Sequence, residues 1–130
     1  MEITTQVLNQ VEVITIKGRV DSVEASRLEE ALEAANRRGM HWLVIDMSQL
    51  EYMSSAGFRA LATAQRNSKR HEQGEVILTE LQPLVHAALE LVGFTDYFQI
   101  IDPGSAALKH AQISATGIAG ADAQPASSGG

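Results

Sequence analysis

The first twenty residues carry two short runs of apolar and β-branched residues that predict an antiparallel hairpin. Residues 2–8 (EITTQVL) and 11–18 (VEVITIKG) are rich in Ile, Val and Thr, which are the residue types enriched in strands. The polar pair Asn9 and Gln10 separates the two runs, as expected for the turn of a hairpin. The chain is therefore predicted to open with two paired strands.

Residues 21–39 show the spacing of an amphipathic helix. Apolar residues recur every three or four positions while Glu and Arg occupy the opposite face, which predicts that one side of this helix packs on a core. Asp21 is a natural N-cap, with Glu24 three residues later as in a capping box, and Gly39 supplies a left-handed stop. The apolar face consists of Ala25, Leu28, Ala31, Leu32 and Ala35.

The middle of the chain alternates between continuous apolar runs and helical patterns. Residues 41–46 (HWLVID) lack polar alternation, which is typical of a strand covered on both faces. A second helix is predicted from Phe58 to about His71, and residues 75–79 (EVILT) predict a further strand. This order is that of strand-helix-strand units.

Two more helices and one more strand are predicted downstream. Pro83 fits the first turn of a helix over residues 83–93, and residues 96–101 (DYFQII) predict the last strand. Residues 102–111 predict a short final helix, with Asp102 as its cap and Pro103 at its first position.

These elements predict a single α/β domain over residues 1–111. Successive strand-helix-strand steps imply parallel strands with right-handed crossovers. Together with the hairpin they predict a mixed five-stranded sheet with about four helices. Residues 112–130 contain too few large apolar side chains to offset the cost of ordering them. We interpret this segment as a flexible tail.

Composition and charge narrow the class of protein. A net charge of −6 provides no positive field for a phosphate backbone, so direct nucleic-acid binding is not expected. The chain has no cysteine, which suits a reducing compartment and makes the cytoplasm the default location. No apolar stretch is long enough for a membrane span, and the first residues lack the pattern of a secretion signal.

The most unusual stretch is residues 46–65 (DMSQLEYMSSAGFRALATAQ), which places Ser54 and Ser55 between a strand and a helix. Serine is a favoured N-cap, so helix capping explains either residue. The same position also suits phosphorylation, because a phosphate there would face the positive end of the helix dipole. Phosphorylation adds roughly −1.5 to −2 charges, which would change a binding surface without refolding the core. Local physics leaves both interpretations open.

Other chemistry is poorly supported by the residues present. A catalytic serine needs a nearby base, but the four histidines are spread along the chain and MSSAGF is not a G-x-S-x-G elbow. Asp46 lacks the acidic partners and lysine of a receiver-like phosphoacceptor, so we expect it to hydrogen-bond within the turn towards Ser48. No phosphate-binding glycine motif and no metal-ligand spacing occurs. No catalytic, cofactor or metal site is predicted.

Three stretches, VITIKGRVDSVEASRLEEAL, LVIDMSQLEYMSSAGFRAL and PLVHAALELVGFTDYFQI, resemble in order and spacing the STAS domain of bacterial anti-anti-sigma factors. The resemblance covers about residues 3–110. It implies a binding switch rather than an enzyme. In members of that family the unmodified protein binds an anti-sigma factor that is also a serine kinase, and this frees a sigma factor. The resemblance further implies that the kinase then phosphorylates the switch protein and that a PP2C-type phosphatase resets it.

The resemblance also assigns roles to residues of the serine motif. In the better-known version the motif reads Asp, Ser, Ser or Thr, Gly, and the serine after Asp is modified. Aligned on Gly57, these first three positions are Ser54, Ser55 and Ala56 here, so Ser55 is the implied phosphoacceptor and Ser54 the fallback. The implied partner surface comprises Asp21, Ser54, Ser55, Ala56, Gly57 and Arg59.

Two alternatives stay open at this point. The domain can serve as a STAS module in another regulatory or transport-associated complex. An enzyme that binds nucleotides or hydrolyses a substrate with Ser55 is the alternative from another class.

Overall fold

The computed structural model describes residues 1–70 and 74–117 of the 130-residue chain. The strands are β1 (Glu2–Leu8), β2 (Val11–Val20), β3 (Trp42–Asp46), β4 (Leu50–Met53), β5 (Glu75–Thr79) and β6 (Gln99–Ile100). The helices are α1 (Glu24–Arg37), α2 (Ser55–Arg70), α3 (Pro83–Leu91) and α4 (Gly104–Thr116), with a short 3-10 helix η1 at Thr95–Tyr97.

The main sheet has the strand order β1-β2-β3-β5-β6. The β1–β2 pair is antiparallel and the later pairs are parallel, so the predicted mixed sheet of five strands is confirmed. Asn9 and Gln10 both have positive φ, at 51° and 67°, as a tight two-residue hairpin turn requires.

A sixth strand, β4, was not predicted from the sequence. It pairs in parallel with the end of β2, with Val20 opposite Met53. The pairing of β2 with β3 stops at Thr15, so the remaining length of β2 has a free edge that β4 occupies. The four residues of β4 bury only Leu50 and Met53, which is too short and weak a pattern to stand out in the sequence.

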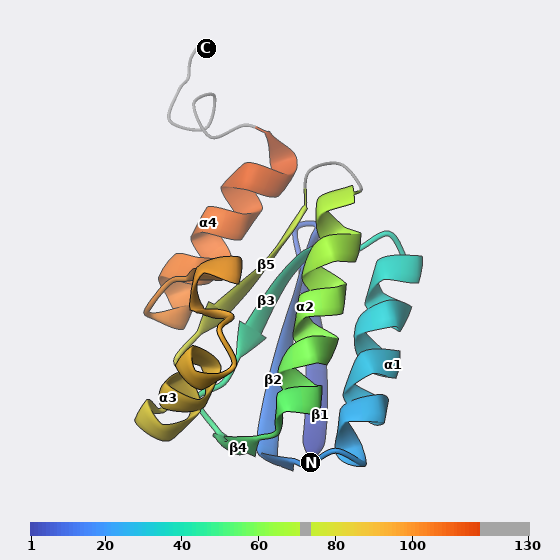
Figure 1. Cartoon of the computed structure of the whole chain (residues 1–130). Helices are drawn as coiled ribbons and strands as arrows, with labels where there is room; N and C mark the ends of the chain where they lie inside the picture. The colour runs from blue at the N-terminus through green and yellow to red at the C-terminus, as the bar shows by residue number, and fades with distance from the viewer. Residues whose placement is uncertain (71–73, 118–130) are drawn as a thin grey trace.

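Helices cover both faces of the sheet, as Figure 1 shows, with α1 and α2 side by side on one face. Neighbouring residues of β3 point to opposite sides: Ile45 belongs to the large core cluster with α1, α2 and α3, whereas Val44 packs with Ala107 and Ala111 of α4. The interpretation of residues 41–46 as a strand covered on both faces is confirmed.

The last two predicted elements need correction. The strand predicted over residues 96–101 is only Gln99–Ile100, because Asp96 and Tyr97 belong to η1. Asp102 does not cap α4. Its carboxylate accepts hydrogen bonds from the Thr79 hydroxyl at 3.2 Å and the Glu80 N–H at 2.6 Å.

The boundaries of α2 and α4 also differ from the prediction. Helix α2 begins at Ser55 and not at Phe58. Pro103 is the N-cap of α4, and the helix runs to Thr116, past the predicted start of the tail at residue 112. The rest of that tail, from residue 118, lies outside the described residues, as does His71 beyond the end of α2. None of the described helices is long and apolar enough to cross a membrane.

Candidate functional site

The ends of β2 and β4 bring Asp21 beside the serine pair, although more than thirty positions of sequence separate them. Val20 and Met53 are register partners, and the Ser54 N–H donates to the Val20 carbonyl at 2.8 Å. Asp21 and Ser54 are therefore the next residues along two adjacent strands, and α1 and α2 begin close to one another. The implied partner surface is contiguous at this point.

Ser54 serves as the cap of α2. Its hydroxyl oxygen accepts a hydrogen bond from the Gly57 N–H at 3.3 Å, and its carbonyl accepts one from the Phe58 N–H at 3.2 Å. These bonds satisfy backbone donors that a helix start leaves unpaired. The side chain is half-buried. Ser54 therefore has a structural role that occupies its hydroxyl.

Ser55 is the first residue of α2 and is exposed. Within residues 1–70 and 74–117, no hydrogen bond engages its hydroxyl. The first turn of α2 contains no acidic residue, so no carboxylate within that turn neutralises the positive end of the helix dipole. The structure thus separates two serines that capping arguments alone left equivalent: one hydroxyl is occupied and the other is accessible.

Gly57 is buried, although the implied partner surface includes it. A Cβ atom at this position would lie 2.6 Å from Met53 Cγ and 3.2 Å from Val20 Cγ1. The glycine therefore lets α2 approach β4 and β2 closely. Ala56 is partly buried and packs against the same core.

The remaining two implied contacts are exposed. Asp21 accepts a hydrogen bond from the Glu24 N–H at 2.8 Å, but α1 begins at Glu24 with Val23 as its N-cap. The predicted capping box is not formed, because the Glu24 carboxylate pairs with Arg27 at 2.7 Å. Arg59 is exposed on α2, four positions after Ser55. Residues at this spacing are neighbours on a helix surface, so Arg59 places a positive charge one turn from the accessible hydroxyl.

Three further exposed residues, which the sequence pattern did not indicate, lie beside this site. The Arg19 guanidinium carbon lies 4.6 Å from the centre of the Tyr52 ring, an arrangement typical of a cation–π contact. Tyr52 is 41% exposed and Val23 is 78% exposed. Arg19 and Tyr52 are register partners on β2 and β4. The pairing of Arg19 with Tyr52 follows only once residues 50–53 are identified as a strand beside β2.

None of the three histidines that the structure describes is positioned by its element as a base for these serines. His41 precedes β3, at the opposite edge of the sheet from the serine motif, whereas His86 lies on α3 and His110 on α4. Asp46 accepts a hydrogen bond from the Ser48 N–H at 2.9 Å, as predicted for a turn residue. In the part of the chain that the structure describes, no group of three His, Asp or Glu residues is arranged to hold a metal ion.

Sequence comparison finds close relatives of this chain. A family model described as the STAS domain matches residues 2–107. BtrV of Bordetella bronchiseptica, a candidate anti-sigma factor antagonist, is 33% identical over 107 residues, which are 82% of this chain and 91% of that protein. The anti-sigma-B factor antagonist of Listeria monocytogenes is 30% identical over 87 residues, which are 67% of this chain and 75% of that protein.

Structural comparison agrees with the sequence. The anti-sigma factor antagonist SpoIIAA in its unphosphorylated form matches with a TM-score of 0.67 and 17% identity, covering 84% of this chain and 96% of that one. The phosphorylated Bacillus SpoIIAA matches with a TM-score of 0.65 and 15% identity, covering 84% and 99%. At these identities the likeness shows a shared fold. Because the family model spans most of the residues that form this sheet and its helices, the chain belongs to the STAS domain family.

Proposed function

We propose that this protein is an anti-anti-sigma factor that acts in the cytoplasm. In its unphosphorylated form it binds an anti-sigma factor that is also a serine kinase, and the sigma factor held by that kinase is released. Support comes from the curated relatives, which are named as anti-sigma factor antagonists and share about a third of their residues with this chain over most of its length.

The observation that carries the switching step is the contrast between Ser54 and Ser55. Ser55 offers an exposed hydroxyl at the first position of α2, while the neighbouring hydroxyl is occupied by the cap. Phosphorylation of Ser55 would add roughly −1.5 to −2 charges to the partner surface. The phosphate would repel or crowd the bound kinase without breaking a bond of the folded chain, and a PP2C-type phosphatase would restore binding.

The partner surface in this proposal is the exposed ring around Ser55. It comprises Asp21, Arg59 and the Arg19–Tyr52 pair, with Val23 as an exposed apolar residue on the same side. Tyr and Arg are the residue types that most often dominate protein interfaces. Ala56 and Gly57 contribute by fixing the position of Ser55 from beneath, because both pack inward.

The modification is tested with the anti-sigma kinase of the source organism and ATP. We expect phosphate on Ser55 alone, mapped by mass spectrometry. Ser55→Ala should abolish the modification, and Ser54→Ala, the matched control, should retain it. Phosphate on Ser54 or elsewhere in the wild-type chain would contradict the assignment.

Binding is tested separately by titrating the same kinase with Ser55→Asp and Ser55→Asn. The two side chains have similar size, but only Asp carries a charge. We expect Ser55→Asp to bind at least about tenfold more weakly than Ser55→Asn, because a like or unpaired charge at an interface costs on the order of 1.4 kcal/mol or more. Equal, tight binding by both variants would show that charge at this position is not the switch.

A further inference from the structure

The outer face of α3 is apolar, like its inner face. Val85 and Leu89 are buried in the core, as expected for a packed helix. The residues of α3 that face solvent are Pro83, Leu84, Ala87, Glu90 and Leu91, and only Glu90 is charged. A helix with apolar residues on both sides is usually covered on both sides.

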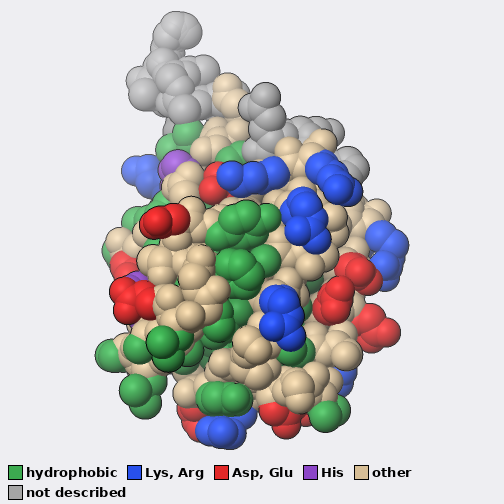
Figure 2. Space-filling view, in the orientation of Figure 1, with side chains coloured by type: hydrophobic (Ala, Val, Ile, Leu, Met, Phe, Trp, Pro, Cys, Tyr) green, Lys and Arg blue, Asp and Glu red, His purple; other side chains and the backbone are tan. Residues whose placement is uncertain are grey.

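The two leucines on this face are unusually exposed. Leu84 is 80% exposed and Leu91 is 88% exposed, and their spacing of seven residues places them on one stripe of the helix with Ala87 between them. Figure 2 shows apolar side chains protruding over the region where Figure 1 places α3. Contiguous exposed apolar surface of this kind marks interaction sites.

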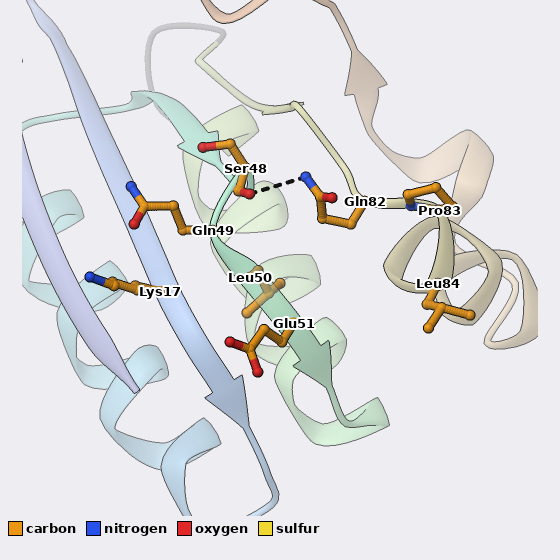
Figure 3. A pocket seen from close by; sticks show the side chains of 8 residues that line it. All are labelled: Lys17, Ser48, Gln49, Leu50, Glu51, Gln82, Pro83 and Leu84. Carbon is orange, nitrogen blue, oxygen red and sulfur yellow. Dashed lines mark hydrogen bonds between the residues drawn. The ribbon is translucent and has the colours of Figure 1, made fainter.

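A groove runs beside this stripe. It has a volume of about 590 Å³. Figure 3 shows Leu84 of α3 on one side of it and Leu50 and Glu51 of β4 facing it from the other. The Gln82 side-chain amide donates to the Ser48 carbonyl at 3.0 Å and ties the two walls together. The stripe and the groove form one surface, which we call the α3 surface.

The charge around the α3 surface is mainly acidic. The chain contains no Lys or Arg between residues 71 and 108, and Glu51, Glu90 and Asp96 are exposed in or near this region. Lys17 is the basic residue that lines the groove. In Figure 2 the Lys and Arg side chains gather mainly over α1 and α2, whereas acidic side chains flank the protruding apolar ones.

This chemistry disfavours a second copy of the chain as the occupant. Two α3 surfaces packed on each other would bring their acidic residues together, in a protein whose net charge is already −6. An occupant with the opposite charge avoids this repulsion.

We propose that the α3 surface docks an amphipathic helix of a partner protein, with apolar residues that pack on Leu84 and Leu91 and with Lys or Arg beside them. The basic residues would pair with Glu51 and Glu90, and the apolar stripe would occupy the groove. The residues of this docking surface differ from those of the proposed surface around Ser55, and binding to it would require no phosphorylation.

The test uses the unphosphorylated chain and two synthetic amphipathic peptides, one of Leu and Lys in helical spacing and one with Glu in place of each Lys. Binding is followed through the backbone amide signals in NMR titrations. We expect the Leu/Lys peptide to shift signals of α3 and β4, and the Leu/Glu peptide to leave them unchanged. No shift at α3 with the Leu/Lys peptide, or equal binding of both peptides, would overturn the proposal.

Surface variants then locate the binding. The double variant Leu84→Ser/Leu91→Ser should bind the Leu/Lys peptide about tenfold more weakly or worse, and Glu51→Gln/Glu90→Gln should also weaken it. The matched control Val7→Thr removes an exposed apolar side chain from β1, where Val7 is 57% exposed, and should bind like the wild type. Sedimentation of the free chain completes the test: a dimer that Leu84→Ser/Leu91→Ser abolishes would assign the surface to a second copy instead.

Discussion

Helices α2 and α4 begin at the same edge of the sheet, but the backbone N–H groups of their first turns donate to different kinds of acceptor. At the start of α4, the Gly104 N–H donates to the carboxylate of Glu80 at 2.7 Å. Asp102 accepts hydrogen bonds from Thr79 and from the Glu80 N–H. Thr79 of β5, Glu80 directly after it and Asp102 after β6 are thus joined by hydrogen bonds, and the Glu80 carboxylate already faces the start of α4.

At the start of α2 the arrangement is open. Ser54 supplies a neutral hydroxyl to the Gly57 N–H, and Ser55 is exposed beside it with its hydroxyl unengaged among the described residues. A helix N-terminus favours negative charge. The α4 end therefore holds its anion as part of the fold, whereas in the proposed switch the α2 end receives one by modification.

Replacing the first-turn glycine of each helix should have opposite effects. At Gly57 a Cβ would lie 2.6 Å from Met53 Cγ, so Gly57→Ala should lower the free energy of unfolding by about 2 kcal/mol through overpacking. At Gly104 the nearest atom would be 3.7 Å away, so Gly104→Ala should raise it by about 0.5 kcal/mol. Urea denaturation of both variants measures the difference. Similar effects at the two positions would mean that close packing beneath Ser55 is not special.

Removing Asp102 from the hydrogen-bond network at the start of α4 should lower the free energy of unfolding by less than overpacking at Gly57. Asp102→Ala removes the acceptor of the buried Thr79 hydroxyl and of the Glu80 N–H. We expect a loss of about 1–2 kcal/mol in the free energy of unfolding, because a donor without an acceptor costs the desolvation of that group. Thermal and urea denaturation measure it. The control Asp96→Ala, at an exposed residue of η1, should be nearly neutral, and equal losses would argue against the network.

The two serines should differ in stability even before any kinase is added. Ser54→Ala removes the cap of α2 and should cost about 1 kcal/mol. Ser55→Ala removes an unengaged hydroxyl and should change the free energy of unfolding by less than about 0.5 kcal/mol. Denaturation midpoints of both variants provide the measurement. A larger loss for Ser55→Ala would reverse the assignment of cap and acceptor.

The sequence predicted those parts of the fold that depend on local pattern. The turn at Asn9 and Gln10, the buried strand β3 and the glycine stops of α1 and α3 follow from neighbouring residues alone, and Gly39 and Gly93 have the positive φ that such stops need. Asp102 was misassigned because its true partners, Thr79 and Glu80, are more than twenty positions away in sequence. An acidic residue before Pro and Gly has the pattern of a cap, and tertiary contact overrides it.

Neighbouring residues alone could not decide whether Ser54 or Ser55 caps α2, because this also depends on contacts between distant parts of the chain. Which serine caps α2 depends on where β4 ends, and β4 owes its existence to the free edge of β2. Once Met53 is fixed opposite Val20, Ser54 becomes the cap and Ser55 the first helical residue. The family resemblance pointed to the same serine through an alignment on Gly57.

The smallest expected effect concerns Arg59, and it sharpens the contrast between the two helix ends. A phosphate on Ser55 would lie one turn before this exposed guanidinium, and an acid that precedes a base by four residues stabilises a helix by about 0.2–0.5 kcal/mol. Arg59 should therefore lower the pKa of the second ionisation of the phosphate, because the positive charge favours the dianion. In Arg59→Gln that pKa should rise, measured by ³¹P NMR titration of the phosphorylated chain. The control Arg66→Gln, further along α2, should titrate like the wild type.

Since exposed charges are screened, the difference in pKa between Arg59→Gln and the wild type should shrink as the salt concentration rises. A phosphate that titrates identically in the wild type and both variants would mean that the helix end alone receives it, and Arg59 would then be left to contact the partner kinase.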